Sequence, residues 1–182
     1  FGSSWLRDAH RGPILALAGG SGLAPVKSTV EQALANLTGN EVNFGPRDVG
    51  PGGLASIKAE GSIREPSVTR REGDLIEFAL MIPIDLELSV RLAAHDHRFK
   101  TELRAHLRLT ARAKAPLHIF IDVPAPREND IDVKVNAQGL RASVLDLVAD
   151  VEGELKRYVA RYVGKQIDKS EIRRMRDIDV RR

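Results

Sequence analysis

The sequence predicts an α+β fold in which a mostly antiparallel β-sheet packs on one long C-terminal helix, preceded by a single βα unit. The sheet is predicted from two long runs within residues 74–112, in which apolar and polar residues alternate. Alternation over this length is typical of antiparallel strands with one buried face and one solvated face. The helix is predicted from apolar residues that recur at spacings of three and four between Val144 and Ile167.

The βα unit is predicted at the start of the chain. Residues 14–18 form a continuous apolar run of the length of a buried strand, and glycines follow at positions 19, 20 and 22. A helical pattern then begins at Leu23, with Pro25 suited to the first turn, and ends near Gly39. A strand, a glycine-rich turn and a helix in this order present free backbone N–H groups at the positive end of the helix, where a pyrophosphate can bind.

The longer string around this turn is more specific than its glycines. Residues 12–28 read GPILALAGGSGLAPVKS, and residues 1–7 read FGSSWLR. Residues 1–38 resemble the start of the NAD(P)-binding domain in the ferredoxin–NADP reductase superfamily, and most of all the reductase components of bacterial aromatic-ring oxygenases. The resemblance implies that NAD(P) binds through residues 19–25. The implied pyrophosphate contacts are Gly20, Ser21, Gly22, Leu23, Ala24 and Pro25.

The reductase resemblance covers only this segment. A flavin-binding barrel with its Arg-x-Tyr-Ser motif, the remaining βα units and a Cys-Gly-Pro motif have no counterpart in the sequence, so FAD binding is not supported. A reductase must hold flavin and nicotinamide together, which one βα unit cannot do. The segment is therefore interpreted as a fragment, a fusion or a domain remnant. The alternative function is a fragment of a flavin-dependent NAD(P)H:ferredoxin reductase, and whether the chain is an enzyme stays open.

Glycine and proline at positions 45–46 and 50–53 predict a linker over residues 41–53. This linker divides the chain into a truncated dinucleotide-binding unit, residues 1–40, and a sheet-plus-helix domain, residues 54–182. Shorter strands are expected at 54–60, 62–71, 117–123 and 131–137. Pro83 interrupts the first long run, which predicts a bulge, a bend or an edge position there.

Two groups of polar residues are candidates for binding. Residues 95–97, His-Asp-His, are predicted to form the turn between the two long strands rather than a metal site, because neighbouring side chains in a hairpin rarely converge on one ion. The basic residues of the second strand predict an exposed stripe that either binds anionic surfaces or is neutralised by Glu77, Asp85 and Glu87 on the neighbouring strand. The stripe consists of Arg98, Lys100, Arg104, Arg108 and Arg112.

Composition narrows the classes of function. The chain has 182 residues, no cysteine, 4% aromatic residues and a net charge of only +3, so disulfides, thiolate metal sites and nucleic-acid binding are not expected. No run approaches the roughly 18 apolar residues of a transmembrane helix, and a soluble, cytoplasmic protein is expected. The sequence leaves open whether the chain forms a homo-oligomer.

Residues 54–182 also resemble, in pattern alone, the tubular lipid-binding architecture, in which a curved sheet wraps a long helix around an apolar cavity. This resemblance implies an apolar small molecule or a lipid as the ligand. The residues expected to line the core or such a cavity are Ile76, Phe78, Leu80, Leu86, Leu88, Leu103, Leu107, Val148 and Leu155. The leading hypothesis is a non-catalytic binding or interaction protein for an apolar ligand, carrying an incomplete NAD(P)-binding segment and no metal.

Overall fold

The computed structural model describes residues 23–73, 75–115, 117–136 and 142–179, and it confirms the predicted α+β class. Its strands are β1 (Glu41–Val49), β2 (Ala55–Ile63), β3 (Ser67–Arg71), β4 (Ile76–Leu92), β5 (His95–Lys114), β6 (His118–Asp122), β7 (Ile131–Val135) and β8 (Asp177–Asp179). Its helices are α2 (Leu23–Ala35), α3 (Ala142–Ile167) and α4 (Ser170–Met175), with short 3-10 turns η2 (Pro51–Gly53) and η3 (Glu128–Asp130).

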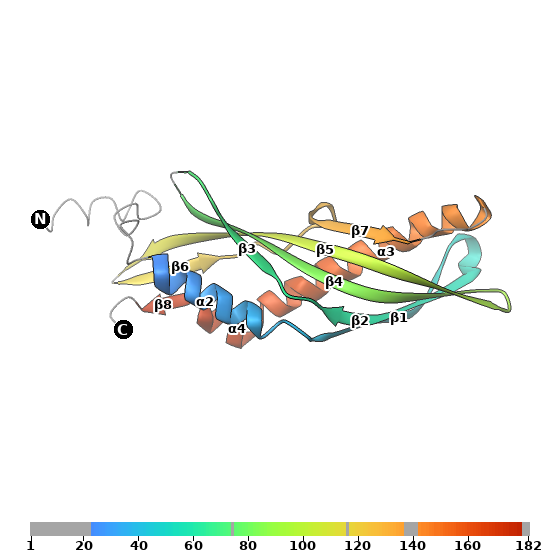
Figure 1. Ribbon diagram of the computed structural model, residues 1–182, viewed down its shortest axis with the longest axis horizontal. Helices are drawn as coiled ribbons and strands as arrows, with labels where there is room; N and C mark the ends of the chain where they lie inside the picture. The colour runs from blue at the N-terminus through green and yellow to red at the C-terminus, as the bar shows by residue number, and fades with distance from the viewer. Residues whose placement is uncertain (1–22, 74, 116, 137–141, 180–182) are drawn as a thin grey trace, which may run out of the picture.

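The described strands form one antiparallel sheet built around the long β4–β5 hairpin. Each long strand has two short neighbours that follow one another along its outer edge. β4 pairs with β2 along one half and with β3 along the other, while β5 pairs with β7 and then with β6. The sheet order is therefore β1-β2-β4-β5-β6-β8, with β3 and β7 as side branches. Figure 1 shows the resulting elongated, twisted sheet with α3 along it and with α2 and α4 side by side near β8.

The alternating pattern of the two long strands is confirmed residue by residue. The even-numbered apolar residues of β4 from Ile76 to Val90 are buried, and so are the odd-numbered residues of β5 from Phe99 to Ala111. The predicted helix is confirmed as well, since α3 buries Val151, Leu155, Val159 and Val163 on one stripe. The helix predicted from Leu23 is α2, which buries Val26, Val30 and Leu34 in the same core.

Pro83 lies inside β4 without interrupting its pairing with β5, where it stands opposite Arg104. Its carbonyl accepts a hydrogen bond from the amide of Arg64, on the side of β4 that faces away from β5. Because N and O of one residue point to the same side of a strand, the missing N–H falls in the gap between the end of β2 and the start of β3. Of the three predicted outcomes, the structure therefore shows a local edge position.

Two sequence-based expectations are wrong. Residues 41–49 are not a linker but strand β1, which pairs with β2 and accommodates Gly45 and Pro46 at an irregularity between Phe44 and Arg47. Residues 95–97 are not the hairpin turn: the turn is formed by residues 93 and 94, and β5 begins at His95. The ion pair between Arg91 Nε and Asp96 Oδ1, at 2.9 Å, joins the two strands next to this turn.

Candidate functional site

One helix cannot cover the apolar face of this sheet. β4 and β5 have 17 and 20 residues, which is roughly 60–70 Å of strand at about 3.4 Å per residue. α3 has 26 residues, or about 39 Å at 1.5 Å per residue. The part of the apolar face that α3 leaves open is covered by α2 and α4, which contact each other. Packing defects are expected at the junction where α3 ends and α2 and α4 begin to cover the sheet.

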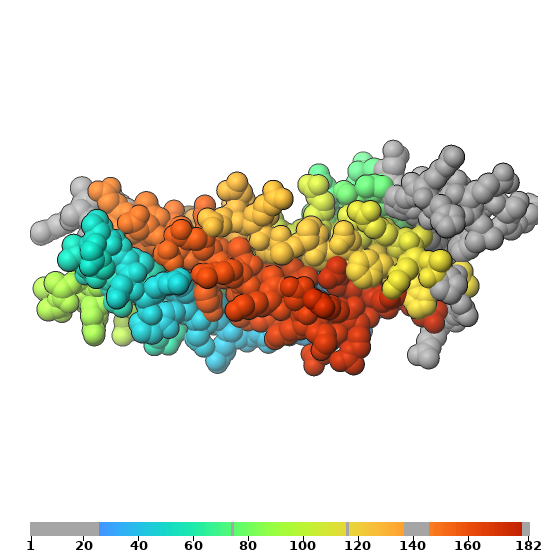
Figure 2. Space-filling view, turned by 180° about the vertical axis from the view of Figure 1, so that it is seen from behind, coloured from blue at the N-terminus to red at the C-terminus, as the bar shows by residue number. Residues whose placement is uncertain are grey.

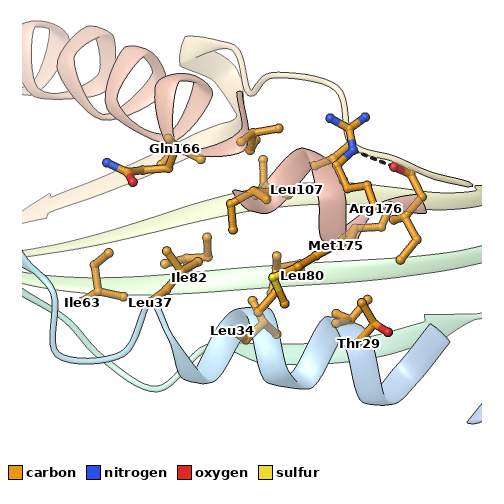
Figure 3. A pocket seen from close by; sticks show the side chains of 18 of the residues that line it. Thr29, Leu34, Leu37, Ile63, Leu80, Ile82, Leu107, Gln166, Met175 and Arg176 are labelled. Atoms are coloured by element: carbon orange, nitrogen blue, oxygen red, sulfur yellow. Dashed lines mark hydrogen bonds between the residues drawn. The ribbon is translucent and has the colours of Figure 1, made fainter. Parts of the chain in front are cut away.

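An apolar pocket lies at this place, between the sheet and the three helices, with a cavity volume of about 90 Å³. Figure 3 shows α2 on one side of it and α3 and α4 on the other. The sheet contributes Ile63, Leu80, Ile82, Leu107, Leu109 and Ile121. The helices contribute Val30, Ala33, Leu34, Val163, Ile167, Ile172 and Met175, and the connecting segments add Leu37 and Val123. The polar residues among the lining are Thr29, Tyr162, Gln166 and Arg176.

Arg176 has its charge directed out of the apolar pocket. Its Nε donates to the carbonyl of Ile121 at 2.7 Å, and its guanidinium lies 5.0 Å from the ring centroid of Phe120. Nη2 is 3.7 Å from Asp122 Oδ1, so the positive charge has a carboxylate beside it. The dashed line in Figure 3 marks the bond from Nε. The space between the helices is therefore lined by hydrocarbon, and it suits an apolar occupant.

A second feature, the α3–β1 hollow, lies where α3 passes β1. It is lined by Phe44, Gly45, Pro46, Arg47, Tyr158, Arg161, Tyr162 and Lys165 and has a volume of about 430 Å³, open to solvent. Tyr158 packs edge-on against Phe44, with ring centroids 4.8 Å apart, and stacks against Tyr162 at 6.1 Å. Its hydroxyl donates to the carbonyl of Asn43. Burial, and then the neighbouring Tyr162, raises the pKa of the Tyr158 phenol, which keeps it protonated as a donor.

The predicted pyrophosphate site is only partly within the described residues. Gly20, Ser21 and Gly22 lie outside them, and Leu23, Ala24 and Pro25 form the first turn of α2. NAD(P) binding through residues 19–25 stays a prediction.

The His-Asp-His sequence is placed on β5 with Asp96 on one face of the sheet and His95 and His97 on the other, because successive side chains of a strand alternate. These three side chains do not converge. A charged pair, Asp96 with Arg91, holds the pKa of the Asp96 carboxyl below its usual value, mainly through their hydrogen bond.

The basic stripe of β5 is partly neutralised, as one alternative predicted. Arg98 lies 3.6 Å from Glu87, whereas Asp85 pairs with Arg64, outside the stripe. Arg112 lies 3.8 Å from Asp122. Within the part of the chain that the structure describes, Arg104 and Arg108 form no ion pair. The charges on this face are thus mixed in sign along its length.

The cations of the α3–β1 hollow were not predicted from the sequence. In the sequence, Tyr158 and Tyr162 belong to the apolar stripe between Val144 and Ile167 that predicts the helix. The signal that could have revealed the hollow is a second stripe of spacing four, Arg157, Arg161 and Lys165, directly beside the tyrosines. Arg47 could not be found this way, because it belongs to a segment predicted to be a linker.

No protein family profile matches the chain, and no curated protein matches it. One similar solved structure is the crystal structure of a lipopolysaccharide binding protein, with a TM-score of 0.46 and 12% sequence identity. The alignment covers 85% of this chain and 39% of that chain, so this chain spans about two-fifths of that protein's length. A similarity this low carries no functional argument, and the predicted reductase resemblance of residues 1–38 has no support from these comparisons.

No helix within the described residues has the length and hydrophobicity required to cross a membrane.

Proposed function

We propose that this chain is a non-catalytic binding protein for an apolar small molecule or the hydrocarbon chain of a lipid. The observation that carries the proposal is the apolar pocket between α2, α3, α4 and the sheet, whose one charged lining residue, Arg176, has its guanidinium turned outward. Apolar pockets of this kind, with few polar groups at the rim, are typical of small-molecule sites.

The size of the cavity limits how a ligand can enter. A volume of about 90 Å³ is smaller than the roughly 150 Å³ of an apolar cavity that holds benzene, and far below the roughly 300–1,000 Å³ of common ligand sites. A hydrocarbon chain therefore needs α2 or α4 to move away from the sheet. α4 is the easier of the two to displace, because it has no buried residue, whereas α2 is anchored by Val26, Val30 and Leu34.

A pair of matched substitutions in α2 tests this proposal. Ala33 lines the apolar pocket, and Ala35, two residues further, is exposed. A phenyl ring at position 33 occupies the pocket, so Ala33→Phe should weaken binding at least about tenfold, while Ala35→Phe should leave it unchanged. Binding of the uncharged fluorophore Nile red, and its displacement by 1-dodecanol, provide the measurement.

Urea unfolding of both variants is the control for folding. A folded Ala33→Phe variant that binds 1-dodecanol as tightly as the unsubstituted chain would refute the location of the site. An unsubstituted chain that binds neither Nile red nor 1-dodecanol would refute the function.

A further inference from the structure

We propose that the apolar pocket and the α3–β1 hollow are two halves of one site, whose ligand is an amphipathic molecule with an anionic head group, a carboxylate or a phosphate. The inference rests on the proposed function, because the apolar pocket supplies the half that binds the chain of this ligand. The α3–β1 hollow supplies the half that binds the head group.

The two halves lie next to each other on α3 and meet at Tyr162. Tyr162 lines both, and the consecutive residues Lys165 and Gln166 line one each. Figure 2 shows α3, in orange to red, running along the molecule with the segment of β1, in blue to cyan, beside it. Because Tyr162 lines both halves, a ligand that occupies both passes the ring of Tyr162 on its way from Gln166 to Lys165.

The charge of the α3–β1 hollow has one sign. Its lining includes the cations Arg47, Arg161 and Lys165 and no carboxylate. Arg47 is already neutralised, because its Nη1 lies 3.1 Å from Glu154 Oε2. The same carboxylate also accepts a hydrogen bond of 2.5 Å from Arg157, so Glu154 is shared between two arginines. The Glu154 carboxylate is thereby paired with Arg47 and Arg157.

The other two cations remain available to an anion. The Nε of Arg161 donates to the carbonyl of Arg157 at 3.3 Å, which leaves its terminal nitrogens for a ligand. Across residues 23–73, 75–115, 117–136 and 142–179, neither Arg161 nor Lys165 has an ion pair. A guanidinium and an ammonium at a spacing of four on a helix lie on the same face, where one carboxylate or phosphate can contact both.

The tyrosines connect the charged part to the apolar part. The hydroxyl of Tyr158 is engaged by the carbonyl of Asn43, so its ring, packed on Phe44 and Tyr162, presents an apolar surface beside the cations. Tyrosine is suited to such a boundary because its ring is apolar and its edge is polar. The ring of Tyr162, which lines both halves, would contact the first carbons of the ligand after its head group.

A free anion would not be bound strongly here. Arg161 and Lys165 are both exposed to solvent, and exposed charge pairs are weak because water screens them. Most of the affinity must therefore come from burial of the chain, with the head group adding selectivity. The shared chemistry is an anion attached to a hydrocarbon chain, and the head group can be either a carboxylate or a phosphate.

The test compares the binding of 1-dodecanol, dodecanoate, dodecyl phosphate and inorganic phosphate to the full chain. The three chain ligands are kept below the concentration at which they aggregate. The variant is Arg161→Gln with Lys165→Gln. The matched control is Arg104→Gln with Arg108→Gln, which removes the same charge from the far face of the sheet, where both residues are exposed. Isothermal titration calorimetry gives the dissociation constants.

The expected result is that dodecanoate or dodecyl phosphate binds roughly tenfold tighter than 1-dodecanol, from about threefold to fivefold for each exposed cation. The Arg161/Lys165 variant should lose this roughly tenfold advantage, while its dissociation constant for 1-dodecanol should change less than twofold. The Arg104/Arg108 control should keep it. Whichever anion binds more tightly identifies the preferred head group.

Three outcomes would overturn the inference. Anionic and uncharged chains that bind equally well would refute the head-group site while the proposed function stands. Inorganic phosphate that binds as tightly as dodecyl phosphate would make the α3–β1 hollow a site for free anions. If none of the three chain ligands binds, the proposed function fails together with the inference.

Discussion

Enlarging the apolar pocket should tighten ligand binding at the same time as it destabilises the protein. Leu107 is 7% exposed and lines the pocket from β5. Leu107→Ala should cost about 2–5 kcal/mol of unfolding free energy, from the lost burial and the space that is left. That space is continuous with the pocket. A bound chain that places two more methylene groups there gains about 1.6 kcal/mol, at about 0.8 kcal/mol each, or roughly fifteenfold in Kd.

Leu103→Ala is the matched control for this prediction. Leu103 lies four residues earlier on the same face of β5, is 1% exposed and is not part of the pocket lining. Both variants should unfold at a lower temperature, by about 6–12 °C for a loss of about 3 kcal/mol in a chain of this size. Only Leu107→Ala should bind 1-dodecanol more tightly, measured by displacement of Nile red. If the two variants have the same affinity for 1-dodecanol, the reasoning that places the chain beside Leu107 is wrong.

Three further predictions concern the sheet and the first segment. A Cβ at Gly61 would lie 1.9 Å from the carbonyl oxygen of Asp85, so Gly61→Ala should lower the free energy of unfolding by at least about 2 kcal/mol. At Gly153, in α3, the nearest atom to an added Cβ is 3.8 Å away, so Gly153→Ala should raise the free energy of unfolding by about 0.5–1 kcal/mol. Urea unfolding that gives both changes the same sign would contradict this. Hydrogen bonds from a lysine and a histidine lower the pKa of Asp177, so this carboxylate stabilises the fold above its unfolded pKa of about 3.9 and loses that contribution as the pH falls through the lower folded value. Asp177→Asn should therefore cost about 0.5–1 kcal/mol at pH 7 and progressively less in acid, and a cost that is independent of pH would refute the sign. If residues 19–25 bind a pyrophosphate, the nicotinamide fluorescence of NAD(P)H should change when the protein is titrated into it. Gly22→Glu should weaken this binding at least about tenfold, because it places a carboxylate against the phosphates. Equal affinity of the variant and the unsubstituted chain for NAD(P)H would rule out this turn.

The faces of the sheet could be predicted because alternation is a local property. In β4 and β5, the even or odd number of a residue decides which face of the sheet its side chain lies on. Burial of the apolar residues on one face then fixes the register of the two strands. The same reasoning identified α3 from its spacing of three and four. Leu80 and Leu107, predicted to line the core or a cavity, do line the apolar pocket.

The parts that could not be predicted depend on partners that are distant in the sequence. β1 contains glycine and proline, which indicate a linker in isolation, yet pairing with β2 makes residues 41–49 a strand. The position of α2 on the sheet has no local signal, because any helix with an apolar stripe could pack on any apolar face. The apolar pocket follows from the lengths of three helices relative to two strands, and the spacing of residues within one element does not contain that information.

Displacement of α4 by an entering ligand would break specific hydrogen bonds between α4 and the sheet. If a chain enters by displacing α4, the connection from α4 to β8 must move as well. The amide of Ile121 in β6 donates to the carbonyl of Arg176 at 2.8 Å, and Arg176 Nε donates back to the carbonyl of Ile121. Both bonds join the end of α4 to the sheet.

Saturation with 1-dodecanol should therefore speed up hydrogen exchange at the Ile121 amide, because its acceptor moves with α4. The amides of α3 from Val151 to Val159 should be unaffected, since that stretch buries Val151, Leu155 and Val159 and does not line the pocket. Exchange measured residue by residue with NMR, with and without 1-dodecanol, separates the two regions. An Ile121 amide that exchanges at the same rate in the saturated complex would mean that the chain enters without moving α4, and that α2 must open instead.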